Sequence, residues 1–133
     1  MRFLILVAFL MYGAPALHAK EMSQHRAFFV IGEPNSDAWK LLIENPSDRE
    51  ATMSVAIQKL GGKMLSYHWG LGDGRNYILI RMPDDPVLIQ ALYVARLGDG
   101  LLNSYRMIEL IDSAAMADAL ARVPDIKAVD NLQ

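Results

Sequence analysis

The chain of 133 residues contains no cysteine. A disulfide, a thiol nucleophile and a thiolate-bound metal are therefore excluded. Histidine is also scarce, because only His18, His25 and His68 occur and they lie far apart in sequence. A transition-metal site usually needs roughly three or four ligands, so we predict no metal site from these residues alone. No haem-ligand motif is diagnostic either, and we predict no cofactor.

Clustered basic charge and long apolar runs are lacking as well. The chain has 13 Lys and Arg against 15 Asp and Glu, a formal net charge of −2. This balance gives no electrostatic footprint for nucleic acid. No apolar run approaches the roughly 20 residues needed to cross a bilayer, so we expect no stable membrane span. The glycines of Gly70–Gly74 precede a predicted strand rather than a helix, which excludes a phosphate-binding loop.

Residues 1–19 have the layout of a secretory signal peptide. Arg2 precedes an apolar run of 10 residues, and small residues follow it. We predict cleavage after Ala19, or after Ala16, and a periplasmic or secreted mature protein. The alternatives are a retained N-terminal anchor and a true start at Met22.

The centre of the remaining chain reads as a β-hairpin. Lys63–Trp69 and Asn76–Met82 are predicted strands, and an Asp-Gly turn lies between them. Two further strands are predicted at 27–32 and 101–110, and helices are predicted at 38–44, 47–60 and 86–97. Asp37 and Ser47 are the predicted N-caps of the first two helices, Ser47 in a capping box with Glu50. This order, β-α-β-β-α-β, predicts an α+β, ferredoxin-like fold with a four-stranded antiparallel sheet and an extra C-terminal helix.

The predicted domain covers residues 26–122, after a polar lead-in at 20–25. Asp112 or Ser113 is expected to cap the last helix, which we expect to run to about Arg122. Pro124 is expected to stop it, leaving 123–133 as a flexible tail.

Three segments carry a resemblance to a known family. DAWKLLIENPSDRE, AIQKLGGKMLSYHWGLGD and RMPDDP, in this order, resemble the GYD domain family over about Arg26 to Leu120. The family's Tyr-Asp pair is missing, since Tyr77 follows the turn and no Asp follows it. The resemblance implies a dimeric α+β barrel. GYD domains have no agreed function, and similar folds host monooxygenases, isomerases, haem-handling enzymes and ligand-binding modules, so the fold does not settle the activity.

His68 is the candidate catalytic residue. In a regular strand it shares a face with Met64 and Ser66, while Tyr67 and Trp69 face the other way. A histidine inside a barrel could act as a general base near neutral pH. The alternative is a hydrogen-bonded histidine at an interface.

The candidate ligand-binding residues come from three strands. Tyr77 and Arg81 share the face of their strand opposite to the one that packs on helices. Arg81 either binds an anion or pairs with Asp84 or Asp85. Tyr105 and Arg106 lie on opposite faces, and the strand register decides which one faces inward. The predicted ligand-binding set is Ser66, Tyr77, Arg81 and Arg106.

Three functions remain open. The first is an exported homodimer that binds a small, partly apolar molecule between two sheets. The second is a cofactor-independent monooxygenase- or isomerase-like enzyme with His68 as proton handler. The third is a structural or assembly domain whose sheet face is only an interface. The expected partners are a second copy of the chain and a small ligand, with no nucleic acid.

Overall fold

The computed structural model describes residues 25–130. The predicted signal peptide, its two cleavage sites and most of the polar lead-in lie outside this part, as do residues 131–133. The described chain contains β1 (His25–Pro34), α2 (Ser36–Glu44), α3 (Arg49–Lys59), β2 (Lys63–Trp69), β3 (Asn76–Pro83), α4 (Pro86–Gly98), β4 (Leu102–Leu110) and α5 (Ser113–Asp130). Among these residues, no helix combines the length and apolarity that crossing a membrane requires.

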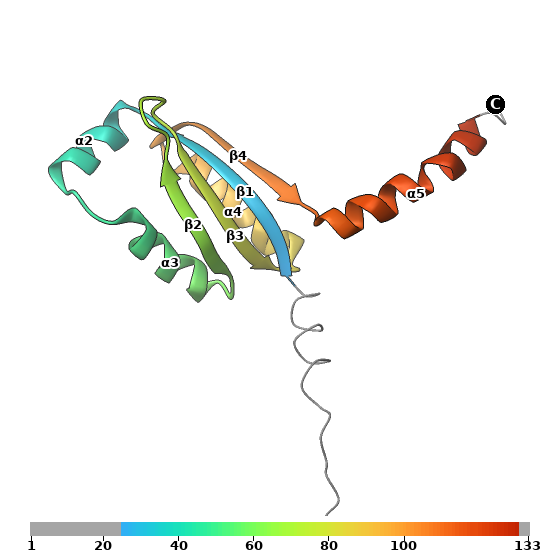
Figure 1. The fold of residues 1–133 in the computed structure, drawn as a ribbon. Coiled ribbons are helices and arrows are strands. Elements are labelled where there is room, and N and C mark those ends of the chain that lie inside the picture. Colours follow the sequence, from blue (N-terminus) through green and yellow to red (C-terminus); the bar gives the residue numbers. More distant parts are fainter. Residues whose placement is uncertain (1–24, 131–133) are drawn as a thin grey trace, which may run out of the picture.

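The four strands form one sheet in the order β2-β3-β1-β4, and all neighbours are antiparallel. The two central strands, β1 and β3, are not consecutive in the chain (Figure 1). The predicted α+β fold with a four-stranded antiparallel sheet is therefore confirmed, and its strand order is compatible with a ferredoxin-like fold.

One face of the sheet carries the core. Side chains alternate along β1 and β3, so that Phe28, Val30, Ile80 and Met82 are buried while their neighbours are only half-buried. Helices α3 and α4 cover this face and add Ile57 and Leu92 to the cluster. Figure 1 shows no helix over the opposite face, which we call the open face.

The first two helices begin with capping residues other than the predicted ones. Asn35 caps α2, and its side-chain oxygen accepts the Ala38 N–H at 3.0 Å. Asp37 lies inside this helix, where it pairs with Lys40. Asp48, not Ser47, caps α3, because its carboxylate accepts two backbone N–H groups of the first turn. A charged cap gains additionally from the helix dipole, which favours Asp48 over the neutral serine.

A β-bulge in β2 changes the predicted side-chain pattern. Met64 pairs with Ile80, but Ser66 already pairs with Leu79, so Leu65 is the extra residue. The prediction that Met64 shares a face with His68 is therefore wrong, since Met64 packs against the core.

The last helix extends beyond its predicted end. Asp112 caps α5 as expected, accepting the Ala115 N–H at 2.7 Å. The helix then continues through Pro124 to Asp130 and points away from the sheet (Figure 1). Proline removes the bond to the carbonyl four residues earlier, at Leu120. Leu120 is exposed, so water can hydrate that carbonyl, and the prediction that Pro124 stops the helix is wrong.

Candidate functional site

The strand register places all five predicted site residues on the open face. His68 lies opposite Tyr77, and Ser66 lies opposite Leu79 of the same strand. Arg81 also lies on this face of β3, and Arg106 reaches it from β4 by pairing with Ile31. Directly opposed residues point to the same side of a sheet. These polar groups share the face with half-exposed apolar side chains: Phe29, Ile31, Leu79, Ile108 and Leu110.

The register also decides between Tyr105 and Arg106. Arg106 is exposed on the open face, whereas Tyr105 pairs with Gly32 and packs beside the core. Burial raises the pKa of Tyr105, so it remains protonated at neutral pH.

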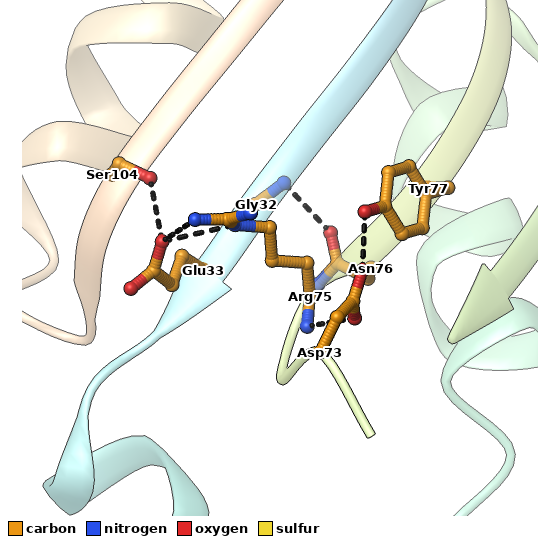
Figure 2. Close-up of polar contacts among 7 residues, drawn as sticks. All are labelled: Gly32, Glu33, Asp73, Arg75, Asn76, Tyr77 and Ser104. Atoms are coloured by element: carbon orange, nitrogen blue, oxygen red, sulfur yellow. Dashed lines mark hydrogen bonds and ion pairs between the residues drawn. The ribbon is translucent and has the colours of Figure 1, made fainter. Parts of the chain in front are cut away.

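Tyr77 already forms a hydrogen bond with another side chain of the protein. Its hydroxyl donates a short hydrogen bond to the Asp73 carboxylate, whose other oxygen accepts the Arg75 N–H at 2.9 Å (Figure 2). This bond raises the pKa of Tyr77 and lowers the pKa of Asp73. The sequence has no adjacent Tyr-Asp pair, yet the turn brings a tyrosine and an aspartate together in space.

A second polar group fastens the same turn to the neighbouring strands. The Arg75 guanidinium pairs with the Glu33 carboxylate at 3.0 Å, and Ser104 donates to the same carboxylate oxygen at 3.4 Å (Figure 2). These contacts join the turn to β1 and β4. At this end of the open face, the polar side chains therefore mainly bind one another.

Of the two alternatives predicted for Arg81, the ion pair with Asp84 or Asp85 does not form within the described residues. Within residues 25–130, the partner of Asp84 is Arg26, at 3.5 Å, and Arg26 also binds Glu109 at 2.8 Å. Arg81 is half-buried, and no carboxylate of the described chain lies within ion-pair distance of it. The same described residues bring together no group of three or more His, Asp or Glu side chains that could hold a metal ion.

A cavity of about 740 Å³ lies on the other face of the sheet. We call it the helix-side cavity, and its volume is that of a typical small-molecule site. It is bounded by the sheet, by α2 and the connection to α3, by α4 and by the start of β4. Its apolar walls include Leu41, Leu42, Trp69, Ile78, Leu101 and Leu102, and its polar groups include Arg49, Tyr67, Asn76, Arg96, Asp99 and Tyr105.

Asn76 is fixed in the floor of this cavity. The residue is 9% exposed, and its side-chain oxygen accepts the Gly32 N–H at 3.1 Å (Figure 2). A Cβ at position 32 would lie 2.7 Å from this oxygen, so only glycine permits the approach. The oxygen keeps a second lone pair and the amide NH₂ carries two donors, so this side chain can still bind a further group.

The Tyr67 hydroxyl lies among several donors. Burial raises the pKa of Tyr67, while the charge of Arg49 and hydrogen bonds from Asn76 and Arg49 oppose this rise. The positive charge of Arg96 also opposes the rise in the pKa of Tyr67. Groups that lower the pKa of a phenol do so by stabilising its negatively charged form. Because its pKa is raised, Tyr67 remains protonated at neutral pH.

Arg96 is only partly satisfied by the protein. Its Nη1 donates to Asp99 at 3.2 Å, and its Nη2 contacts the Met53 sulfur at 3.8 Å. Its Nε is buried and has no hydrogen-bond partner. An unpaired buried donor typically costs about 1–3 kcal/mol, so this guanidinium can still gain from another acceptor.

The sequence patterns do not point to the polar residues of the helix-side cavity. The sequence predicts no functional role for Arg49, Tyr67 or Arg96. One signal was present, since Asn76 is polar yet belongs to the face of its strand that packs on helices. A comparison of the chain with protein-family models, curated proteins and solved structures finds no match.

Proposed function

We propose that this chain is a small-molecule-binding module whose ligand occupies the helix-side cavity. The observation that carries this proposal is the cavity itself, with a volume of about 740 Å³, largely apolar walls and a few converging polar groups. Small-molecule sites generally combine these features. We also propose that the protein is exported and forms a homodimer, as the sequence predicts.

The cavity has a fixed floor and a helical cover. Asn76 is held by the Gly32 N–H at the floor. The cover is α2, which contributes Leu41 and Leu42. A rigid floor lowers the ordering cost of binding, because fewer groups must be immobilised when the ligand enters.

The location differs from the one expected, which was a chamber between two sheets. The open face supports pairing instead, because no helix covers it (Figure 1). Phe29, Ile31 and Leu79 lie in the centre of this face, and Ile108 and Leu110 are 37% and 39% exposed beside it. Apolar surfaces of this kind commonly mark an interface. We propose that a second copy covers this face.

No observation favours the enzymatic alternative over binding. His68 is exposed, and its cross-strand neighbour Tyr77 already donates to Asp73. The helix-side cavity lies across the sheet from both residues.

The test uses the full chain and the neutral fluorescent probe N-phenyl-1-naphthylamine. We expect saturable binding to the wild-type protein. Leu42→Trp would fill the cavity and abolish binding, whereas Ile43→Trp would leave it intact because Ile43 is 74% exposed. Native mass spectrometry of the same samples gives the subunit number and detects any retained molecule. Binding that survives Leu42→Trp unchanged, or no saturable binding by the wild-type protein, would contradict the proposal.

A further inference from the structure

We propose that the helix-side cavity selects a monocarboxylate with an apolar body. The carboxylate is bound by Arg49, Arg96 and the Tyr67 hydroxyl, and the body lies against Leu41, Leu42 and Leu101. This inference rests on the proposed function, because it names the ligand class of the same cavity.

The first argument is the unused donor capacity of the cavity wall. Of the five N–H groups that a guanidinium carries, Arg96 gives one to the Asp99 carboxylate and makes a weak contact to the Met53 sulfur. Its Nε has no partner. Arg49 lines the same cavity, and no carboxylate of residues 25–130 lies within ion-pair distance of it. Of the two guanidinium groups, only that of Arg96 therefore has an acidic partner, Asp99.

The second argument concerns the hydrogen of the Tyr67 hydroxyl. The Tyr67 hydroxyl lines the cavity, and the Asn76 amide and the Arg49 guanidinium both oppose the rise of its pKa. The Asn76 oxygen already accepts the Gly32 N–H at 3.1 Å. No hydrogen bond donated by Tyr67 occurs in the described chain, so a ligand oxygen is the fitting acceptor.

The third argument is the charge of the head group. Arg96 is paired with Asp99, whereas no carboxylate of the described residues lies within ion-pair distance of Arg49, so one arginine of the wall is left without an acidic partner. Glu44 also lines the cavity, but it is exposed at the end of α2 and pairs with neither arginine. A monoanion neutralises this site, whereas a dianion would leave an excess negative charge in a partly buried place.

A planar carboxylate suits these donors well. Guanidinium groups bind carboxylates with charge-assisted hydrogen bonds that are about twice as strong as neutral ones. The remaining walls are leucine, tryptophan and isoleucine side chains, which favour an alkyl or aryl body.

The experiment compares acids with their neutral amides. The full chain is titrated with hexanoate, octanoate, decanoate and 4-phenylbutyrate, and with the matching primary amides, at pH 7 by calorimetry. We expect at least one acid to bind about tenfold or more tightly than its amide, the scale of a hydrogen bond to a charged group. Equal affinities of acids and amides would overturn the inference.

Single substitutions test which side chains bind the carboxylate of the ligand. We expect Arg49→Gln to weaken the acid about tenfold and the amide less than twofold, with Arg49→Lys retaining part of the selectivity. Arg122→Gln, on the exposed α5, is the matched control for charge. Tyr67→Phe should weaken the acid, whereas Tyr77→Phe, across the sheet, should not. Unchanged acid binding in both Arg49→Gln and Tyr67→Phe would overturn the assignment.

The outcomes separate this inference from the proposed function. If N-phenyl-1-naphthylamine binds in a Leu42-dependent way but no acid binds, the cavity is a binding site and its carboxylate selectivity is refuted. If neither the dye nor any acid binds, both proposals fail.

Discussion

The indole rings of Trp39 and Trp69 meet with their centroids 5.3 Å apart and their planes tilted by 43°. Trp39 belongs to α2 and Trp69 ends β2, so this contact joins the cover of the helix-side cavity to the sheet. Tyr67 extends the cluster, with its ring 5.8 Å from that of Trp69. The aromatic contacts thus reach from the cover to the polar wall of the cavity.

Trp39→Ala should loosen this cover without unfolding the domain. An aromatic pair contributes about 0.5–1.5 kcal/mol beyond its buried area, and Trp39 is already 36% exposed. We expect a loss of about 1 kcal/mol in the free energy of unfolding and faster amide exchange in α2, measured by urea denaturation and hydrogen exchange. Ile43→Ala, on the exposed side of α2, is the control. Unchanged α2 exchange in Trp39→Ala would show that the indole contact does not hold the helix.

Gly62 allows the chain to pass tightly beneath β3. A Cβ there would lie 2.6 Å from the Arg81 carbonyl oxygen and 2.9 Å from Ile57 Cγ2. We therefore expect Gly62→Ala to reduce the free energy of unfolding by about 1–3 kcal/mol, the usual cost of overpacking.

Gly98→Ala is the matched control for this change. Gly98 ends α4, and a Cβ there has nothing within 4 Å. We expect it to leave stability unchanged or raise it by up to about 1 kcal/mol, because alanine restricts the unfolded chain. Thermal melts of both variants test the pair, and equal melting temperatures would contradict the packing described at Gly62.

Two half-buried tyrosines should make the domain sensitive to alkali. Burial raises the pKa of Tyr67 and of Tyr105 above that of a free tyrosine, about 10. The unfolded chain therefore loses these protons first, and stability that is complete below pH 10 falls as the pH rises through the folded-state pKa values.

The measurement is the free energy of unfolding between pH 8 and pH 11.5. Each tyrosine contributes at most about 1.4 kcal/mol per pH unit to the decline. Tyr67→Phe should flatten the decline relative to the wild type, whatever its effect at pH 8. A decline of identical slope in this variant would show that the Tyr67 proton is not retained on folding.

The sequence predicted the sheet well because its signals are local. Alternation in β3 correctly separated Tyr77 and Arg81 from the buried Ile78 and Ile80. The bulge at Leu65 was missed, because it depends on how β2 pairs with its neighbour rather than on its own residues. The wrong face for Met64 follows directly from that bulge.

The cavity could not be predicted in this way. Arg49, Tyr67 and Arg96 come from three different elements and meet only when α3 and α4 pack on the sheet. The space between them depends on the path of α2 and its connection to α3, which no periodicity encodes. The chemistry of the open face was easier to foresee, since strand alternation alone collects Ser66 and His68.

Pairing through the open face gives the last prediction. Leu79 lies near the centre of this face, between Ser66 on β2 and Phe29 on β1. Leu79→Glu would place an unpaired charge in the apolar interface, which is costly unless the charge is solvated. We expect the wild type to sediment as two chains at micromolar concentration and Leu79→Glu as one.

Leu71→Glu, at a fully exposed turn position, should leave the mass unchanged. Circular dichroism should show that both variants remain folded, because neither side chain belongs to the buried core. A wild type that remains a single chain at high concentration, or a Leu79→Glu variant that still pairs, would leave the open face without its proposed partner.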